Sequence, residues 1–217
     1  MNAMKPSDAI SPIVASLALI AVIPLVAMSA LAIIVDDGRP VFFHQRRIGK
    51  DGRPFDLLKL RSMKRIPSGT RITARSDLRI TTAGRILRKY KIDELPQLWN
   101  VLRGEMCFVG PRPEVPEYVD LVDPRWQQVL SVKPGITDLA SLVFRNEEEL
   151  LDGQADAESF YRSWLLPRKL DLSAHYIRTR SFRTDVRLIA STLRHTLLPH
   201  LHDRHQVAKQ FAYEGSL

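Results

Sequence analysis

The most pronounced pattern along the chain is an uninterrupted apolar stretch close to the N-terminus. Residues 9–35 carry no charged side chain and consist of Ala, Ile, Leu, Val, Ser, Met and two prolines. About 20 apolar residues are enough to span a bilayer, so this stretch is long enough to cross a membrane. Pro24 removes one backbone hydrogen bond and divides the stretch into two pieces that are each too short to span. The pattern therefore leaves open a kinked crossing and a bent segment that enters and leaves by the same face.

The residues that flank the apolar stretch indicate its orientation. The apolar run continues beyond the small residues 30–32, where cleavage of a signal peptide would fall, so a cleaved signal is disfavoured. Basic residues follow the stretch closely, namely Arg39, Arg46, Arg47, Lys50 and Arg53. Because such residues collect on the cytoplasmic side, everything after the stretch is expected in the cytoplasm. We therefore divide the chain into a membrane-associated segment, residues 1–36, and a cytoplasmic domain, residues 37–217.

Shorter periodicities predict a small hairpin followed by helices. Apolar residues at 41–43 and 55–58 predict two strands, and the glycine-containing residues 49–52 predict the connection between them. Residues 65–75 are polar and basic with Pro and Gly, which predicts a mobile loop. Helical spacing begins at Thr82 and resumes at Asp93, after which apolar residues follow at positions i, i+3, i+4 and i+7.

The second half of the chain combines stiff loops with helices. Three prolines exclude helix and central strand at 110–116, and residues 133–137 predict a turn. Helix is expected at 126–132 and, with breaks, at 147–180, where the acidic run at 147–149 is typical of a solvated face. Residues 186–197 predict a basic amphipathic helix that either lies on anionic lipid or packs on the core. The expected fold is a helix-rich α/β domain with a small β-hairpin.

Composition narrows the class of protein. A chain of 217 residues with 45% hydrophobic content suits one domain with a real core. The formal charge of +8 and the pI of about 9.9 indicate an anionic partner, which could be nucleic acid, a phospholipid surface or a nucleotide substrate. Cys107 is the single cysteine, so the chain cannot form an internal disulfide.

Two adjacent acids, Asp93 and Glu94, stand inside a run of arginines and lysines. The helical spacing that follows places them at a helix N-terminus, where free amides and the helix dipole favour anions. One interpretation is an ordinary N-cap followed by a first-turn acid. The other is phosphate chemistry with a divalent metal, because paired carboxylates surrounded by cations suit both a metal and a phosphate.

Several further motifs, in order, make the chain resemble bacterial sugar transferases of the small monotopic phosphoglycosyltransferase family, the polyprenyl-phosphate glycosyl-1-phosphate transferases. The proline-broken apolar segment is followed by GRPVFFHQRRIG at 38–49, KLRSM at 59–63, LR at 87–88, DELPQL at 93–98, NVLRGEM at 100–106, VGPRPE at 109–114, KPGIT at 133–137 and FRN at 144–146. The resemblance covers most of the chain. It differs at Ile23, where relatives often carry Ser, and at Glu105, Cys107 and Asp138, where Asp, Ser and Gly are frequent.

The resemblance implies an activity and a place. A member transfers sugar 1-phosphate from a nucleotide sugar, usually a UDP-sugar, to a polyprenyl phosphate such as undecaprenyl phosphate, and releases UMP. This would be the first membrane step in assembling a bacterial glycan such as capsule, exopolysaccharide, O-antigen or glycoprotein. It implies a re-entrant helix broken at Pro24, the bilayer of the bacterial inner membrane as a partner, and a catalytic domain on its cytoplasmic face.

The resemblance also assigns roles to residues. Asp93 would be the nucleophile that forms a covalent aspartyl-phosphosugar, and Asp93 and Glu94 would bind Mg²⁺. Three arginines would contact the phosphates, Arg112 with particular rigidity because two prolines flank it. The expected binding residues for the nucleotide sugar are Arg88, Arg112, Arg145, Pro111 and Pro113.

Two rival hypotheses come from other classes. A membrane-anchored basic protein could bind nucleic acid or anionic lipid without catalysis, although no nucleic-acid motif is recognisable and no nucleic-acid partner is expected. A metal site could use the C-terminal histidines, His195, His200, His202 and His205, but their irregular spacing favours a solvated tail. The sequence does not specify the sugar, the lipid length or the pathway, and it leaves a homo-oligomer open.

Overall fold

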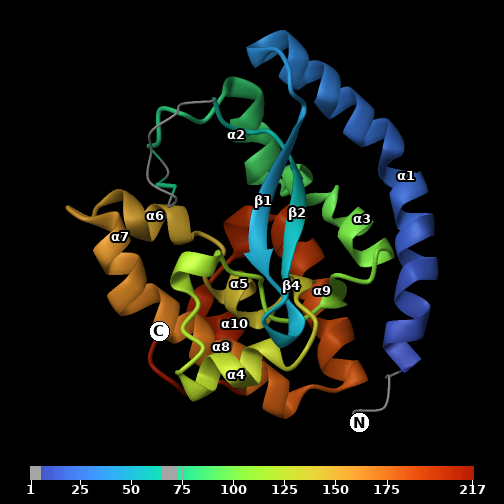
Figure 1. Cartoon of the computed structure of the whole chain (residues 1–217). Coiled ribbons are helices and arrows are strands. Elements are labelled where there is room, and N and C mark those ends of the chain that lie inside the picture. The colour runs from blue at the N-terminus through green and yellow to red at the C-terminus, as the bar shows by residue number, and fades with distance from the viewer. Residues whose placement is uncertain (1–5, 65–72, 75) are drawn as a thin grey trace.

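The computed structural model describes residues 6–64, 73–74 and 76–217, with side chains from residue 12 onward. Most of the loop predicted at 65–75 lies outside the described residues. The domain is helix-rich, as predicted, and its longest strand pair forms a small hairpin (Figure 1). A long apolar helix flanks the domain along one side.

Helix α1 (Pro6–Asp37) runs through Pro12 and Pro24 without interruption. The break predicted at Pro24 is therefore a bend, visible near the middle of α1 in Figure 1, because a lost hydrogen bond kinks a helix that its neighbours still hold. Between Pro12 and Asp37, α1 is long and apolar enough to cross a membrane. The boundary between a membrane segment and a domain at residues 36 and 37 stays a prediction.

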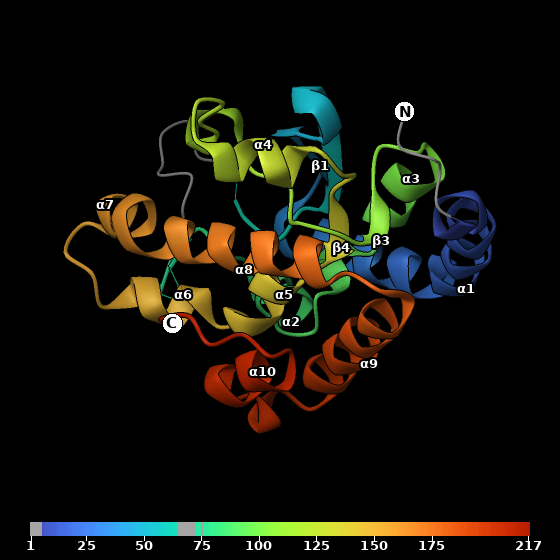
Figure 2. The ribbon, with the colours of Figure 1, turned by 90° about the horizontal axis from the view of Figure 1, so that it is seen from below.

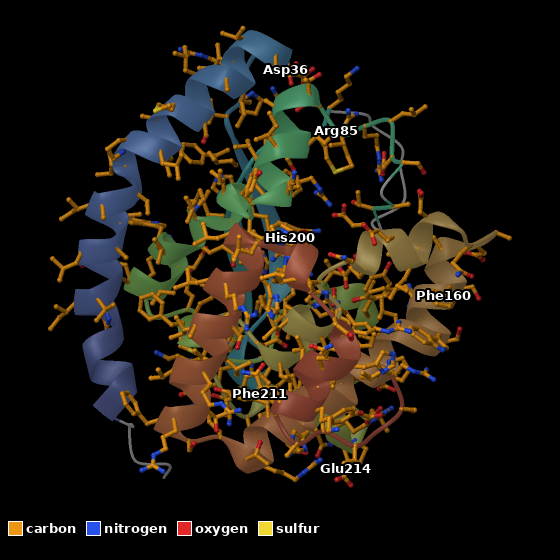
Figure 3. All side chains as sticks on the ribbon, turned by 180° about the vertical axis from the view of Figure 1, so that it is seen from behind. Asp36, Arg85, Phe160, His200, Phe211 and Glu214 are labelled. Carbon is orange, nitrogen blue, oxygen red and sulfur yellow. The ribbon has the colours of Figure 1, made fainter. Side chains whose placement is uncertain are left out.

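Both halves of α1 pack against the same domain. In the first half, Ala15 is fully buried against Leu57 and Val101. In the second half, Ile33 packs with Leu60 and Leu87. Figure 3 shows Asp36, at the end of α1, beside the helix that carries Arg85, and the Asp36 carboxylate accepts a hydrogen bond from the amide of Ala83 at 2.8 Å.

The predicted hairpin is confirmed and is longer than expected. Strands β1 (Phe42–Ile48) and β2 (Pro54–Leu60) pair antiparallel through a tight 3-10 turn, Lys50–Gly52. Helix α3 (Gln97–Leu102) holds β2 through Asn100, whose amide accepts from Leu58 N at 3.1 Å and donates to Asp56 O at 2.8 Å. These two hydrogen bonds hold β2 against α3. They thereby fix the position of Lys59, which follows Leu58 in the strand.

Helix α2 (Thr82–Lys89) and the acid pair are close to their predicted places, with one correction. Asp93 and Glu94 lie in a separate 3-10 turn, Ile92–Glu94, and α3 begins only at Gln97. Their predicted position at the helix N-terminus is therefore wrong. Lys91 precedes the turn with φ +55°, a left-handed conformation that reverses the chain after α2.

The turn predicted at 133–137 is instead largely a short strand. Strand β4 (Gly135–Thr137) pairs parallel with β3 (Cys107–Val109), in the register Cys107 to Gly135. The two backbones approach so closely that a Cβ on Gly135 would lie 2.1 Å from Gly110 N, which only glycine avoids. A strand of three residues is too short to show the alternation of apolar and polar residues from which strands are predicted, so the sequence indicated a turn.

The remaining helices surround the main apolar core. They are η3 (Pro116–Tyr118), α4 (Pro124–Leu130), α5 (Leu139–Val143), α6 (Glu147–Asp152), α7 (Ala157–Phe160), the π-helical turn η4 (Tyr161–Leu165), α8 (Leu166–Thr179), α9 (Phe182–Leu197), η5 (Pro199–Leu201) and α10 (Arg204–Gln210). Figure 2 shows α8 across the centre, with α4 on one side and α9 and α10 on the other. The predicted helix with breaks at 147–180 is confirmed.

The apolar face predicted for α9 does not pack on the core. Leu188, Ser191 and His195 face inward, whereas Val186, Ile189, Leu193 and Leu197 are exposed. Of the two alternatives left open by the sequence, core packing is wrong for these four residues. Contact between these exposed residues and lipid, the other alternative, stays a prediction.

Candidate active site

A cavity of about 920 Å³ lies between the hairpin, α2, the proline-rich loop and helices α6 and α8. About half of the residues that line it are charged. The cations are Arg47, Lys59, Arg61, Lys64, Arg79, Arg88, Arg112 and Lys169, and the acids are Asp93, Glu114, Glu147 and Glu148. Eight cations against four acids make the cavity suitable for a polyanion such as a diphosphate.

Asp93 lines this cavity, and one of its two carboxylate oxygens is buried without a hydrogen-bond partner in the described part of the chain. Its side chain is 4% exposed, and Oδ1 accepts no hydrogen bond from the described residues. Burial raises the pKa of Asp93, and the neighbouring carboxylate of Glu94 raises it further. A buried oxygen without a partner is costly in a native structure, and such an atom indicates a missing ligand or a reactive group.

Glu94 is bound by two cations and is not among the described residues that line the cavity. Arg112 grips it with two contacts, Nη2 to Oε1 at 2.6 Å and Nη1 to Oε2 at 3.2 Å. Lys59 Nζ donates to Oε1 at 3.1 Å. Burial alone would raise the pKa of Glu94, but the charges of Arg112 and Lys59 outweigh it and hold that pKa well below its ordinary range.

The pKa values of Lys59 and Arg112 are shifted in opposite directions. Burial lowers the pKa of Lys59 to about 8, although the charge of Glu94 opposes this shift. The pKa of Arg112 is raised, first by Glu94 and less by Glu147. Arg112 therefore remains charged at every physiological pH, whereas Lys59 is the cation that can lose its proton.

The loop that carries Arg112 is attached on both sides, as its prolines predict. On one side, Gly135 N donates to Pro111 O at 3.0 Å. On the other, Arg47 Nη1 donates to Pro113 O at 3.0 Å and to Glu114 Oε1 at 2.9 Å. Pro111 and Pro113 thus hold Arg112 through the backbone, and a direct contact between these prolines and a substrate stays a prediction.

Arg88 lines the cavity from α2. Its guanidinium forms an ion pair with Glu148 and lies 3.5 Å from Ser62 Oγ, while Nε is buried without a partner among the described residues. The approach of α2 to Ser62 depends on Gly84, since a Cβ there would lie 2.0 Å from Ser62 O. Arg88 can reach a ligand in the cavity if that ligand displaces Glu148.

Arg145 lies outside the described cavity lining. It donates to Thr196 Oγ1 at 3.2 Å and to Lys89 O at 3.1 Å, and so joins α9 to the end of α2. Burial lowers its pKa. Its predicted contact with a substrate phosphate stays a prediction.

Sequence reasoning missed part of the wall. Glu147 and Glu148 were expected on a solvated face, but Glu148 pairs with Arg88 and Glu147 pairs with Lys169 at 2.9 Å. Lys59, in the KLRSM motif, could have been found from its place in that motif. Lys169 and Tyr161 carry no local signal, because only the tertiary fold brings them to the cavity.

The described residues can provide part of a binding site for a magnesium ion. The described residues contain no group of three or more His, Cys, Asp or Glu side chains able to hold a metal. Mg²⁺ needs only one or two carboxylates when substrate phosphates complete its coordination. The carboxylate of Asp93, which lines the cavity, can supply such a ligand, whereas the oxygens of Glu94 are already occupied by Arg112 and Lys59.

The C-terminal histidines form a pair only. The rings of His195 and His202 meet edge to face at 5.4 Å, and His202 contacts Leu142 O at 2.7 Å. Burial lowers the pKa of both rings. The histidine metal site that the sequence disfavoured has no support among the described residues.

A buried carboxylate in a cavity lined by eight cations suits the binding and chemistry of phosphate groups. Sequence comparison agrees with this class. The signature of the family described as bacterial sugar transferase matches residues 5–199. The chain therefore belongs to the bacterial sugar transferase family, and it is a phosphoglycosyltransferase.

Three relatives illustrate the range of similarity. An uncharacterized sugar transferase, EpsL, from Bacillus subtilis is 35% identical over 184 residues, which are 83% of this chain and 82% of the relative. A UDP-glucose:undecaprenyl-phosphate glucose-1-phosphate transferase from Caulobacter vibrioides is 37% identical over 175 residues, 78% of this chain and 61% of the relative. A UDP-N-acetylgalactosamine-undecaprenyl-phosphate N-acetylgalactosaminephosphotransferase from Aeromonas hydrophila is 34% identical over 176 residues, 79% of this chain and 38% of the relative.

Proposed function

We propose that the protein transfers sugar 1-phosphate from a UDP-sugar to polyprenyl phosphate, releasing UMP, as the first membrane step of a bacterial glycan pathway. The observation that carries the proposal is the carboxylate of Asp93, which lines a cavity with eight cations and has one buried oxygen without a partner among the described residues. The names of the Caulobacter and Aeromonas relatives describe transfer from UDP-sugars to undecaprenyl phosphate. Because those names differ in the sugar, they leave the donor of this chain open.

In the first step, an oxygen of Asp93 attacks the β-phosphorus of the UDP-sugar. The new bond joins the carboxylate to phosphorus, and the bond from the β-phosphorus to the bridging oxygen breaks, so that UMP leaves with that oxygen. The product is a sugar phosphate held on Asp93 as an acyl phosphate. Asp93 must be ionised to attack, and its burial removes the water that would weaken the nucleophile.

In the second step, a phosphate oxygen of the polyprenyl phosphate attacks the same phosphorus. The bond between Asp93 and phosphorus breaks, which returns the free carboxylate and yields polyprenyl diphosphate-sugar. No proton needs to be removed from a phosphate oxygen that is already ionised, so the site needs no general base for this step.

Offsetting the charge of the diphosphate is the main task of the remaining residues. Arg112 is rigidly presented and bound to Glu94, while Arg88 and Lys59 line the cavity from α2 and β2. Mg²⁺, held by Asp93 and the substrate phosphates, would supply further charge stabilisation and improve UMP as a leaving group. Glu94 would keep Arg112 and Lys59 in place.

The packing of α1 supports a re-entrant segment at the cytoplasmic face of the inner membrane. Ala15 and Ile33 are both buried on the domain, although roughly 27 Å of helix separates them at 1.5 Å per residue. A straight crossing would carry one of them to the far side of the hydrocarbon core, about 30 Å away. Cysteines placed by Asn2→Cys and Lys50→Cys, each in a Cys107→Ser background, should both react with an impermeant reagent from the cytoplasmic side only. Labelling from opposite sides would exclude this arrangement.

The reaction is tested by UMP release from the detergent-solubilised chain with Mg²⁺, undecaprenyl phosphate and a panel of UDP-sugars. We expect release with one sugar, dependent on the lipid, abolished by EDTA and by Asp93→Asn. The isosteric Asn retains shape and hydrogen-bonding ability but cannot attack as a carboxylate. Retained turnover in Asp93→Asn would refute the nucleophile, and no release with any sugar would count against the reaction.

A further inference from the structure

One wall of the cavity contains charged side chains to which the proposed reaction gives no role. Glu147 begins α6, Lys169 lies on α8, and Tyr161 lies on the π-helical turn that precedes α8. All three line the same cavity as Asp93. Lys169 and Tyr161 are 7% and 5% exposed, so a cation and a phenol are kept in an almost fully buried place. π-helical turns occur often at functional sites.

These side chains form a continuous polar network. Lys169 Nζ donates to Glu147 Oε2 at 2.9 Å and to the Tyr161 hydroxyl at 3.4 Å. The Tyr161 hydroxyl donates to Glu114 Oε2 at 2.7 Å, and Glu114 is held in turn by Arg47. Each member has a partner of suitable charge, which makes the network rigid.

The network has unused hydrogen-bonding capacity at one end. An ammonium group has three N–H donors, and Lys169 uses two of them. No described residue donates to Glu147 Oε1, and the Glu147 side chain is 34% exposed. A free donor and a free acceptor therefore stand side by side in the cavity. This pair matches a sugar hydroxyl or acetamido group, which donates and accepts, and it does not match a phosphate, which Glu147 would repel.

The position of Glu147 fits the sugar rather than the nucleoside. The adjacent residue, Glu148, pairs with Arg88, and Arg112 is close enough for the charge of Glu147 to act on it. Glu147 thus lies beside the two arginines that would hold the diphosphate. In the donor, the sugar is bonded directly to the β-phosphate that Asp93 attacks, whereas the nucleoside is one phosphate further away.

We propose that Glu147 and Lys169 recognise hydroxyl or acetamido groups of the donor sugar, and that Tyr161 is a positioning residue for Lys169. This inference rests on the proposed function. It assigns sugar selection to a pair of residues far apart in the sequence. Glu147 and Lys169 contribute to ground-state binding of the donor, and Asp93 remains the group that forms the bond.

The test measures binding without turnover, in the Asp93→Asn protein in detergent with Mg²⁺. Calorimetry gives the Kd of UDP and of UDP-glucose, UDP-galactose, UDP-N-acetylglucosamine and UDP-N-acetylgalactosamine. The quantity of interest is the ratio of the Kd of UDP to the Kd of the preferred UDP-sugar. A hydrogen bond to a charged group is worth about tenfold to a hundredfold in affinity, so we expect Glu147→Gln to lower this ratio by about tenfold or more.

The matched control is Glu149→Gln, the same change two residues on, at an exposed position outside the described cavity lining. It should leave the ratio unchanged. Tyr161→Phe should lower the ratio while leaving the Kd of UDP unchanged, which a merely destabilised fold would not do. Lys169→Met should act like Glu147→Gln, and Glu147→Gln keeps the test valid if the buried Lys169 variant fails to fold.

An unchanged ratio in Glu147→Gln, or an equal loss of UDP and UDP-sugar affinity, overturns the inference. So does a parent protein that binds no UDP-sugar of the panel more tightly than UDP. Failure of the proposed function is seen separately, as the absence of UMP release by the wild-type protein under the conditions described above.

Discussion

The ion pair between Arg112 and Glu94 should contribute measurably to stability, and Arg112→Met tests this. Removing one partner of a buried ion pair destabilises a protein by about 3–5 kcal/mol. Glu94 keeps Lys59 as a partner and the Arg112 side chain is 22% exposed, so we expect about 3 kcal/mol, the lower end of that range. For a chain of this size each kcal/mol moves the Tm by about 2–4 °C, which predicts a fall of about 6–12 °C.

Thermal unfolding in detergent at pH 7.5 measures the shift, with Arg103→Met as the control. Arg103 also pairs with a glutamate, but its side chain is 60% exposed, so its loss should change stability by about 1 kcal/mol at most. The double variant Arg112→Met with Glu94→Gln should lose less stability than the two single variants added together, because the uncompensated carboxylate is gone. Equal shifts for Arg112→Met and Arg103→Met, or strict additivity, would refute the reasoning.

Three further predictions concern pH, the nucleophile and α2. Burial raises the pKa of Asp93, so kcat/KM should fall on acidification at a pH above the ordinary value of 3.8. Lys59 has a pKa of about 8, so kcat/KM should also fall as the pH rises through that value, and Lys59→Met should remove this second dependence. Asp93→Asn should unfold at the same or a higher temperature than wild type, because it removes a buried charge. A lower Tm would contradict this. Gly84→Ala should lower the Tm by about 2–12 °C, because its Cβ would meet Ser62 O at 2.0 Å and overpacking of this kind costs about 1–3 kcal/mol. A Tm equal to that of wild type would show that α2 tolerates the shift.

The pH dependence of stability has a definite sign for Glu94. Because its folded pKa lies below the ordinary value of 4.5, the stability that its ionised form contributes is fully present above that value. It is lost as the pH falls through the folded pKa. Acid unfolding of Glu94→Gln, compared with wild type, should therefore be less sensitive to pH below about 4.5.

Local pattern was sufficient for most elements of the fold and insufficient for the shortest ones. The strands of the hairpin and most helices are long enough for their periodic pattern of apolar residues to be recognised. The long apolar helix is predicted from its composition alone. By contrast, β4 has three residues, and the acids Asp93 and Glu94 lie in a 3-10 turn that periodicity extended into the next helix. Pro24 was expected to break α1, but packing of both helix halves on the domain keeps the helix continuous.

The residues of the candidate site likewise fall into two groups: those that the sequence indicates and those that only the fold brings together. Asp93 and Arg112 were predicted from the motifs that resemble those of the family, and an unusual charge pattern and flanking prolines also mark them locally. Glu147 was placed on a solvated face because an acidic run usually is solvated, and the fold instead pairs it with Lys169, 22 residues away. No local feature reports such a pair. The ion pairs that separate the role of Glu94 from that of Asp93 likewise depend on tertiary contacts with β2 and the proline-rich loop.

The most direct test of the account is mass spectrometry of the protein after incubation with Mg²⁺ and its UDP-sugar in the absence of polyprenyl phosphate. We predict that one sugar phosphate becomes attached to the peptide that contains Asp93, that undecaprenyl phosphate removes it, and that Asp93→Asn never acquires it. Attachment to another residue, or lipid-dependent turnover by a protein that never carries the sugar phosphate, would rule out a covalent intermediate on Asp93.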